Sequence, residues 1–132
     1  MRFIALAVLT AVSTAAMAGD EPKPSAVALI DAAIADIDSH RALMTRVSIP
    51  ARFTLPRHYH PTEEFLYVAS GNTILRIDGK ADQHLSAGMA FKIPATAVHT
   101  AITETEAAEV IVFRIHPNGQ PIRIPVKDTS ND

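Results

Sequence analysis

The sequence of 132 residues contains no cysteine. It therefore forms no disulfide and offers no attachment point for the lipid of a lipoprotein. It also lacks a glycine-rich phosphate loop, an internal repeat and any cluster of lysine and arginine, and its formal net charge is only -2. This balance of charges gives no indication of binding to nucleic acid or to an anionic membrane.

The sequence has no apolar run long enough to cross a bilayer, although one short run lies near its start. Arg2 precedes an apolar stretch over residues 3–12, and Ala16-Met17-Ala18 provides a small-x-small cleavage site before Gly19. We therefore predict a signal peptide over residues 1–18 and a periplasmic or secreted protein with no membrane contact after cleavage. Removing these 18 residues from 132 leaves 114, which suits one compact domain.

The first part of the remaining chain has helical spacing. Ser25 is a plausible N-cap, and apolar residues recur behind it at intervals of three or four: Val27, Ile30, Ile34 and Ile37. We expect a short amphipathic helix from about Ser25 to Asp38, extending toward Met44, in an N-terminal segment over residues 19–45. Its expected role is to cover an open edge or end of the domain that follows.

From residue 46 to residue 126 the pattern is that of an all-β domain, followed by a tail over residues 127–132. Strands are expected at about 64–69, 73–78, 83–85, 89–93, 97–103 and 107–116, with glycine and proline between them. Apolar residues alternate from Val47 to Leu55 but have the opposite parity to His58 and His60. We therefore expect a turn or bulge near Pro50 to Arg52 that resets the phase.

The most informative residues are His58 and His60. Two histidines one residue apart on an extended segment place both imidazoles on the same face. Pro61 and Thr62 turn the chain, so that Glu64 can return to the same point. Neutral imidazoles and a carboxylate are ligands for a divalent ion such as iron, manganese, nickel or zinc. The pattern therefore indicates a metal site, with His99 as a further candidate ligand.

The spacing of these residues resembles the cupin superfamily. His58-x-His60-x3-Glu64-x6-Gly71 is similar to the first cupin motif from its first histidine onward, and Gly88-x5-Pro94 followed by His99 is similar to the second. The resemblance covers roughly residues 46–116. It implies a small single-domain cupin whose fold is a double-stranded β-helix, or jelly roll. It also implies one bound divalent metal, with His58, His60, Glu64 and His99 as the ligands.

The sequence departs from the family pattern outside these ligands. Arg52 and Thr96 stand where the family has glycines, Met89 where it often has an acidic residue, and Thr103 where it has an asparagine. We expect these departures to affect the loops more than the metal. His40, His84 and His116 are expected to be structural or surface residues.

The predicted face of the ligands is mostly apolar and carries no lysine. Strand alternation places these residues on it: Thr54, Leu66, Val68, Phe91, Ile93, Ala97, Ala101, Ile111 and Phe113. The opposite face would hold Phe65 and Tyr67, joined by Val47, Ile49 and Ile74. Because an exposed apolar face needs a cover, we also expect a homodimer.

Two functions of different classes remain open. The first is a mononuclear, metal-dependent oxygenase acting on a small, partly apolar molecule, with Glu64 as a possible catalytic base. The second is a non-catalytic protein that binds or senses a small ligand through its metal. A lyase or decarboxylase lacks a dedicated inward base, and a sugar isomerase lacks inward polar groups, so we favour neither.

Overall fold

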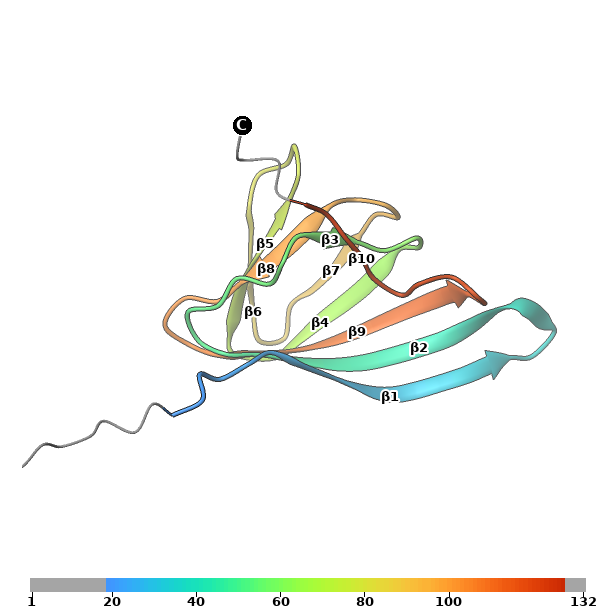
Figure 1. The fold of residues 1–132 in the computed structure, drawn as a ribbon, viewed down its shortest axis with the longest axis horizontal. Helices are drawn as coiled ribbons and strands as arrows, with labels where there is room; N and C mark the ends of the chain where they lie inside the picture. Colours follow the sequence, from blue (N-terminus) through green and yellow to red (C-terminus); the bar gives the residue numbers. More distant parts are fainter. Residues whose placement is uncertain (1–18, 128–132) are drawn as a thin grey trace, which may run out of the picture.

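The computed structural model describes residues 19–127, which form two five-stranded antiparallel sheets (Figure 1). The strands are β1 (Ser25–Ile34), β2 (Ile37–Ile49), β3 (His58–Tyr59), β4 (Glu64–Ser70), β5 (Asn72–Ile77), β6 (Gln83–Ser86), β7 (Ala90–Ile93), β8 (His99–Ile102), β9 (Ala108–Pro117) and β10 (Ile124–Pro125). One sheet has the order β1-β2-β9-β4-β7, and the other has the order β10-β3-β8-β5-β6. The expected all-β fold is confirmed. The predicted signal peptide lies outside the described residues.

The predicted N-terminal helix is wrong, because residues 25–34 form β1 and pair with β2 in an antiparallel hairpin. The register of this pair shifts between Ala28 and Ile30. Before this bulge Val27 lies on the outer face of the sheet, and after it Ile30 does. A bulged strand has therefore reproduced the spacing of three that is typical of a helix. In the described residues no helix is present that could span a membrane.

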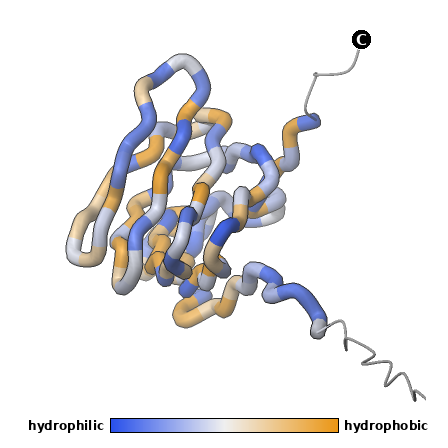
Figure 2. The backbone as a smooth tube through the Cα atoms, turned by 90° about the vertical axis from the view of Figure 1, so that its left-hand side faces the viewer, coloured by the Kyte–Doolittle hydropathy of each residue, from blue (hydrophilic) through white to orange (hydrophobic). Residues whose placement is uncertain are grey.

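The hydrophobic core lies between the two sheets, and hydrophobic and hydrophilic residues alternate along the strands that enclose it (Figure 2). Its buried members are Ile49, Leu66, Val68, Leu75, Ile77, Leu85, Ile93, Val110 and Val112. Strands β4, β5 and β9 each contribute two residues at a spacing of two, as expected for a sheet that is buried on one face. Val47, Phe53 and Leu55 pack against this core, whereas Thr54 is exposed, so its predicted inward position is wrong.

The turn expected near Pro50 to Arg52 is present, but it does not reset the phase. Arg52 has a φ of 56°, yet Ile49 before it and Leu55 after it both contribute to the inner side. The parity changes only between Leu55 and His58, across Pro56. Thr96 also adopts a left-handed conformation, with a φ of 61°. Both positions where the family has glycine therefore keep the backbone conformation that favours glycine.

Gly71, which the first motif requires, is fixed by crowding as well as by its φ of 70°. A Cβ atom at this position would collide with the carbonyl oxygen of Ala107. The second-motif asparagine is replaced by Thr103, whose hydroxyl donates a hydrogen bond to the carbonyl of Pro50. The same hydroxyl accepts a hydrogen bond from the backbone amide of Phe53 at 3.1 Å. Thr103 thus joins β8 to the turn that leads to the histidines.

The outer face of the β1-β2-β9-β4 sheet is mostly apolar over three successive rows of opposed residues, with the exposed Arg46 as their one charged member. The rows are Val27, Arg46, Ile111 and Tyr67; Ile30, Met44, Phe113 and Phe65; and Ala32, Ala42 and Ile115. Phe65 and Tyr67 are 42% and 48% exposed, so their predicted outward position is confirmed. Val47 and Ile49 were predicted to join them but face the core, and Ile74 lies in the other sheet.

Candidate metal centre

Three histidines meet on the inner side of the β3-β8 pair. His58 on β3 stands directly opposite His99 on β8, and His60 follows one residue after β3 ends. The ring centroids are 4.4 Å apart for His58 and His99, 5.0 Å for His58 and His60, and 5.3 Å for His60 and His99. One nitrogen of each ring lies within 4.8 Å of the other two, and all three residues are buried. This arrangement can hold a metal ion.

Backbone carbonyls orient each ring. The Nδ1 atoms of His58 and His99 lie 2.8 Å from the carbonyl oxygens of Pro56 and Ala97, each two residues earlier. The Nδ1 of His60 contacts the carbonyl oxygen of Ile122, in the segment that leads to β10. For His58 and His99, a protonated Nδ1 that donates to a carbonyl leaves Nε2 as the ligand atom, whereas the Nε2 of His60 contacts Glu64 in this structure. The rings are therefore oriented for coordination.

Burial also keeps two of these imidazoles neutral. It lowers the pKa of His58 to about 3, and the nearby Arg123, His99 and His60 add to this effect. Burial likewise lowers the pKa of His99 below its usual value. Because only the neutral imidazole binds a metal, both residues are ready for coordination at neutral pH.

Glu64, the first residue of β4, lies beside the histidines and forms a buried ion pair with Arg114 of β9. The Arg114 Nε donates to its Oε2 at 3.1 Å, and the Nε2 of His60 lies 2.9 Å from the same oxygen. Burial alone would raise the pKa of Glu64, but the hydrogen bond with His60 and the charge of Arg114 lower it to about 2. The carboxylate is therefore ionised. Its Oε1 has no hydrogen-bond partner within residues 19–127.

Arg114 and Arg123 both line the site, and neither was predicted from the sequence. The prediction placed Ile111 and Phe113 inward, but β9 has the opposite phase: Ala108, Val110, Val112, Arg114 and His116 are its buried residues. The alternation of Val110, Val112 and Arg114 was the sequence signal that could have placed Arg114 on the inner face. It was hidden because the outer face of β9 is as apolar as its inner face.

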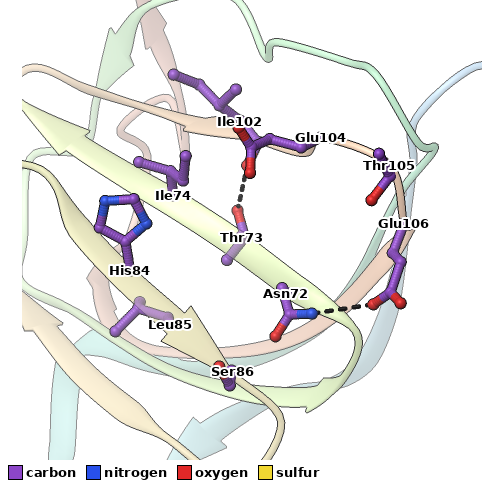
Figure 3. A pocket seen from close by; sticks show the side chains of 10 residues that line it. All are labelled: Asn72, Thr73, Ile74, His84, Leu85, Ser86, Ile102, Glu104, Thr105 and Glu106. Atoms are coloured by element: carbon purple, nitrogen blue, oxygen red, sulfur yellow. Dashed lines mark hydrogen bonds between the residues drawn. The ribbon is translucent and has the colours of Figure 1, made fainter.

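The remaining histidines do not join the site. His116 is 1% exposed, with its Nε2 2.9 Å from the carbonyl oxygen of Gln120 and its Nδ1 unpaired within residues 19–127. His84 is exposed and lines a separate hollow of about 260 Å³ beside β5 and β6 (Figure 3). There Asn72 donates to Glu106 at 2.9 Å. In the described part of the chain, the three-histidine group is the one cluster that could hold a metal.

The three histidines and Glu64 open onto a cavity of about 610 Å³ between the two sheets. Its apolar walls include Ile49, Leu66, Leu75 and Val112, and it is also lined by Pro24, Ser25, Ala26, Ala28, Ile122 and Arg123. The volume is in the range typical of small-molecule sites, which lies at about 300–1,000 Å³. A small molecule with an apolar body can therefore occupy this cavity next to the histidines.

Comparison with known proteins agrees with this geometry. Residues 45–115 match the Cupin_2 family, described as a cupin domain. The chain is 35% identical over 68 residues to a 3-hydroxyanthranilate 3,4-dioxygenase of Mycosarcoma maydis. That match covers 48% of this chain and 38% of the relative, so the chain spans well under half of that protein's length.

Two solved structures share the fold at low sequence identity. The DMSP lyase DddQ from Ruegeria pomeroyi superposes with a TM-score of 0.67 and 18% identity, covering 82% of this chain and 54% of that one. The polyketide cyclase RemF from Streptomyces resistomycificus superposes with a TM-score of 0.62 and 20% identity, covering 81% and 73%. The reactions named for these proteins differ, so the shared fold does not specify a reaction.

Proposed function

This chain belongs to the Cupin_2 family of cupin domains, and on that basis we propose that it is a mononuclear, metal-dependent oxygenase acting on a small, partly apolar molecule. The observation that carries this proposal is the group of three oriented histidines beside an ionised carboxylate, opening onto an apolar cavity. The similarity to a 3-hydroxyanthranilate 3,4-dioxygenase over 68 residues supports the oxidative reaction class.

The donor set fits a divalent iron, manganese, nickel or zinc ion. In this proposal His58, His60 and His99 would hold the ion through Nε2, with Glu64 as the fourth ligand through its unpaired Oε1. Such an ion supplies Lewis-acid polarisation and, if it is redox-active, access to dioxygen chemistry. The ion pair with Arg114 fixes the Glu64 side chain against the site without occupying Oε1.

The chain's own groups set the limits of the chemistry. Glu64 is ionised and can accept a proton, but a pKa of about 2 makes it a weak base. The guanidinium of Arg114 offers only hydrogen-bond donors and therefore does not serve as a base. The leucine, isoleucine and valine side chains of the cavity exclude water from the bound molecule. These groups suit an oxidation better than a reaction that requires a strong general base.

Oxygen consumption by metal-loaded protein tests this proposal. The chain without residues 1–18 should be loaded in turn with iron, manganese, nickel and zinc and assayed on a panel of catechols, aminophenols and keto acids. We expect oxygen uptake with one redox-active metal, and its loss in a His99→Ala variant. If metal binds at one ion per chain and no compound is oxidised, the alternative function of non-catalytic ligand binding takes its place.

We also propose that the protein is a periplasmic or secreted homodimer. The signal-peptide pattern of residues 1–18 supports export, and a mature N-terminus near Gly19 in mass spectrometry of the natural product would test it. The apolar outer face of the β1-β2-β9-β4 sheet supports the dimer, because no described segment covers it. Two such faces related by a two-fold axis would bury each other.

A further inference from the structure

The charges inside the cavity do not balance. Three of its lining residues carry a formal charge: Glu64, Arg114 and Arg123. Glu64 and Arg114 neutralise each other through their buried ion pair. Arg123 has no carboxylate partner within residues 19–127, and its contacts there are with Pro56 and His58. The lining therefore includes one positive charge without a carboxylate partner, on the exposed side chain of Arg123, in addition to that of any bound metal.

The fold places this charge beside the metal centre. Strand β10 pairs with β3, with Ile124 opposite Tyr59 and Pro125 opposite His58, and Arg123 directly precedes this pair. The Nη2 of Arg123 donates to the carbonyl oxygen of Pro56 at 2.8 Å and lies 3.1 Å from the Nδ1 of His58. The guanidinium is thus held in the lining of the cavity, next to His58.

The guanidinium also keeps unused donors. Its contacts within residues 19–127 involve Nη2 alone, so Nε and Nη1 have no hydrogen-bond partner there. An arginine offers five N–H donors in a planar fork that matches the two oxygens of a carboxylate. The neighbouring cavity wall is formed by apolar side chains, among them Leu55 and Ile122. A ligand with a carboxylate at one end and an apolar body fits both features.

We propose that Arg123 is the anion-binding residue of this cavity and that it selects small monoanionic carboxylates with an apolar body. The inference rests on one part of the proposed function, namely that the cavity is the site where the ligand binds. It adds a substrate class to that function. The carboxylate binds the outer edge of the guanidinium, and the apolar body extends between the sheets toward the histidines.

Matched pairs of a carboxylate and its neutral amide test this inference: benzoate with benzamide, salicylate with salicylamide, and hexanoate with hexanamide. Their dissociation constants are measured by calorimetry on the zinc-loaded and metal-free chain without residues 1–18. We expect at least one carboxylate to bind about tenfold or more tightly than its amide, as for a charge-assisted hydrogen bond. In the metal-free chain, Arg123→Met should reduce that ratio to about one, and Arg123→Lys should retain part of it.

Arg76→Met is the control, because Arg76 is an exposed residue paired with Asp82 and does not line the cavity. It should leave the ratio unchanged. If Arg123→Met keeps the full preference, or if no carboxylate binds better than its amide, the inference is overturned. Metal content and oxygen uptake are measured on the same samples. A chain that prefers carboxylates through Arg123 but consumes no oxygen would contradict the oxygenase proposal and leave this inference standing.

Discussion

His58 and His99 face each other across β3 and β8, and each is oriented by the carbonyl group two residues before it. Because both rings reach the site in the same way, the loss of either should remove one ligand without moving the other. We predict one divalent ion per chain, with an affinity at least about tenfold lower in His58→Ala or His99→Ala. Elemental analysis and competition with a chelating dye measure this. His84→Ala is the control. Normal metal occupancy in a variant that combines His58→Ala with His99→Ala would contradict the site.

The metal-free protein should become less stable as the pH falls from about 6.5 toward 3. Below pH 6.5 the unfolded chain protonates His58, whereas burial holds the folded pKa at about 3, so protons favour unfolding. Glu64 acts in the same direction, because its folded pKa of about 2 lies below the usual 4.5. Each group contributes a slope of up to about 1.4 kcal/mol per pH unit within its own range.

Urea denaturation at pH 7, 6, 5 and 4 measures this dependence. In a His58→Gln variant, the part of the slope that begins near pH 6.5 should decrease, since glutamine does not titrate. A free energy of unfolding that stays constant from pH 7 to pH 4 would show that the histidines are not held neutral by burial.

The buried pair of Glu64 and Arg114 should show strong energetic coupling. Arg114→Met leaves a buried carboxylate without its partner, which typically costs about 3–5 kcal/mol. Removing the charge of Glu64 as well, in the double variant with Glu64→Gln, should recover most of that loss. Chemical denaturation of the metal-free single and double variants gives the coupling energy. The exposed pair of Arg76 and Asp82 serves as the control and should show little coupling.

Glycine at two turn positions should stabilise the protein. Arg52 and Thr96 have φ values of 56° and 61°, a conformation that costs a residue with a Cβ about 1–2 kcal/mol. Glycine loses about 0.5–1 kcal/mol through its greater freedom in the unfolded chain. We therefore expect Arg52→Gly or Thr96→Gly to gain up to about 1 kcal/mol in thermal or chemical denaturation. Ala51→Gly, in the same turn but without a positive φ, should instead destabilise.

Light scattering should detect a dimer at micromolar concentration. Phe65 and Tyr67 lie in the apolar rows of the outer face, and a charge there would have to be buried without a partner. Phe65→Glu and Tyr67→Glu should therefore shift the protein to monomers without loss of bound metal. His84→Glu, an exposed position of the other sheet, should remain dimeric. A wild-type chain that is monomeric at every concentration tested would rule out this interface.

The candidate metal ligands were easier to predict than the elements around them. The spacing of His58, His60 and His99 identified the cluster because the motif has to return its ligands to one point. The strand positions from Glu64 onward followed from local alternation and were confirmed. Whether Glu64 also coordinates the metal stays a prediction, because in this structure its Oε2 is bound to Arg114.

Other features depended on contacts that local patterns do not contain. The bulge at residue 29 gave β1 the spacing of a helix, and only pairing with β2 distinguishes the two. The two arginines were missed for different reasons. Arg114 lies on a strand with two apolar faces, whereas Arg123 reaches the site through the pairing of β10 with β3, about 65 residues apart in sequence. Long-range pairing, rather than propensity, determined these outcomes.

The loop between β9 and β10 has a consequence for how this protein could acquire a new specificity. Ile122 orients the candidate ligand His60 through its carbonyl oxygen, while the adjacent Arg123 holds its guanidinium at the cavity with Nε and Nη1 unused. In our proposals a backbone atom of this segment would therefore support the metal site, and a side chain would contact the bound molecule. A graft of residues 118–125 that preserves the backbone path could change the preferred substrate while leaving coordination intact. New specificities could therefore arise by exchange of this segment alone, without any change in the strands that carry the histidines.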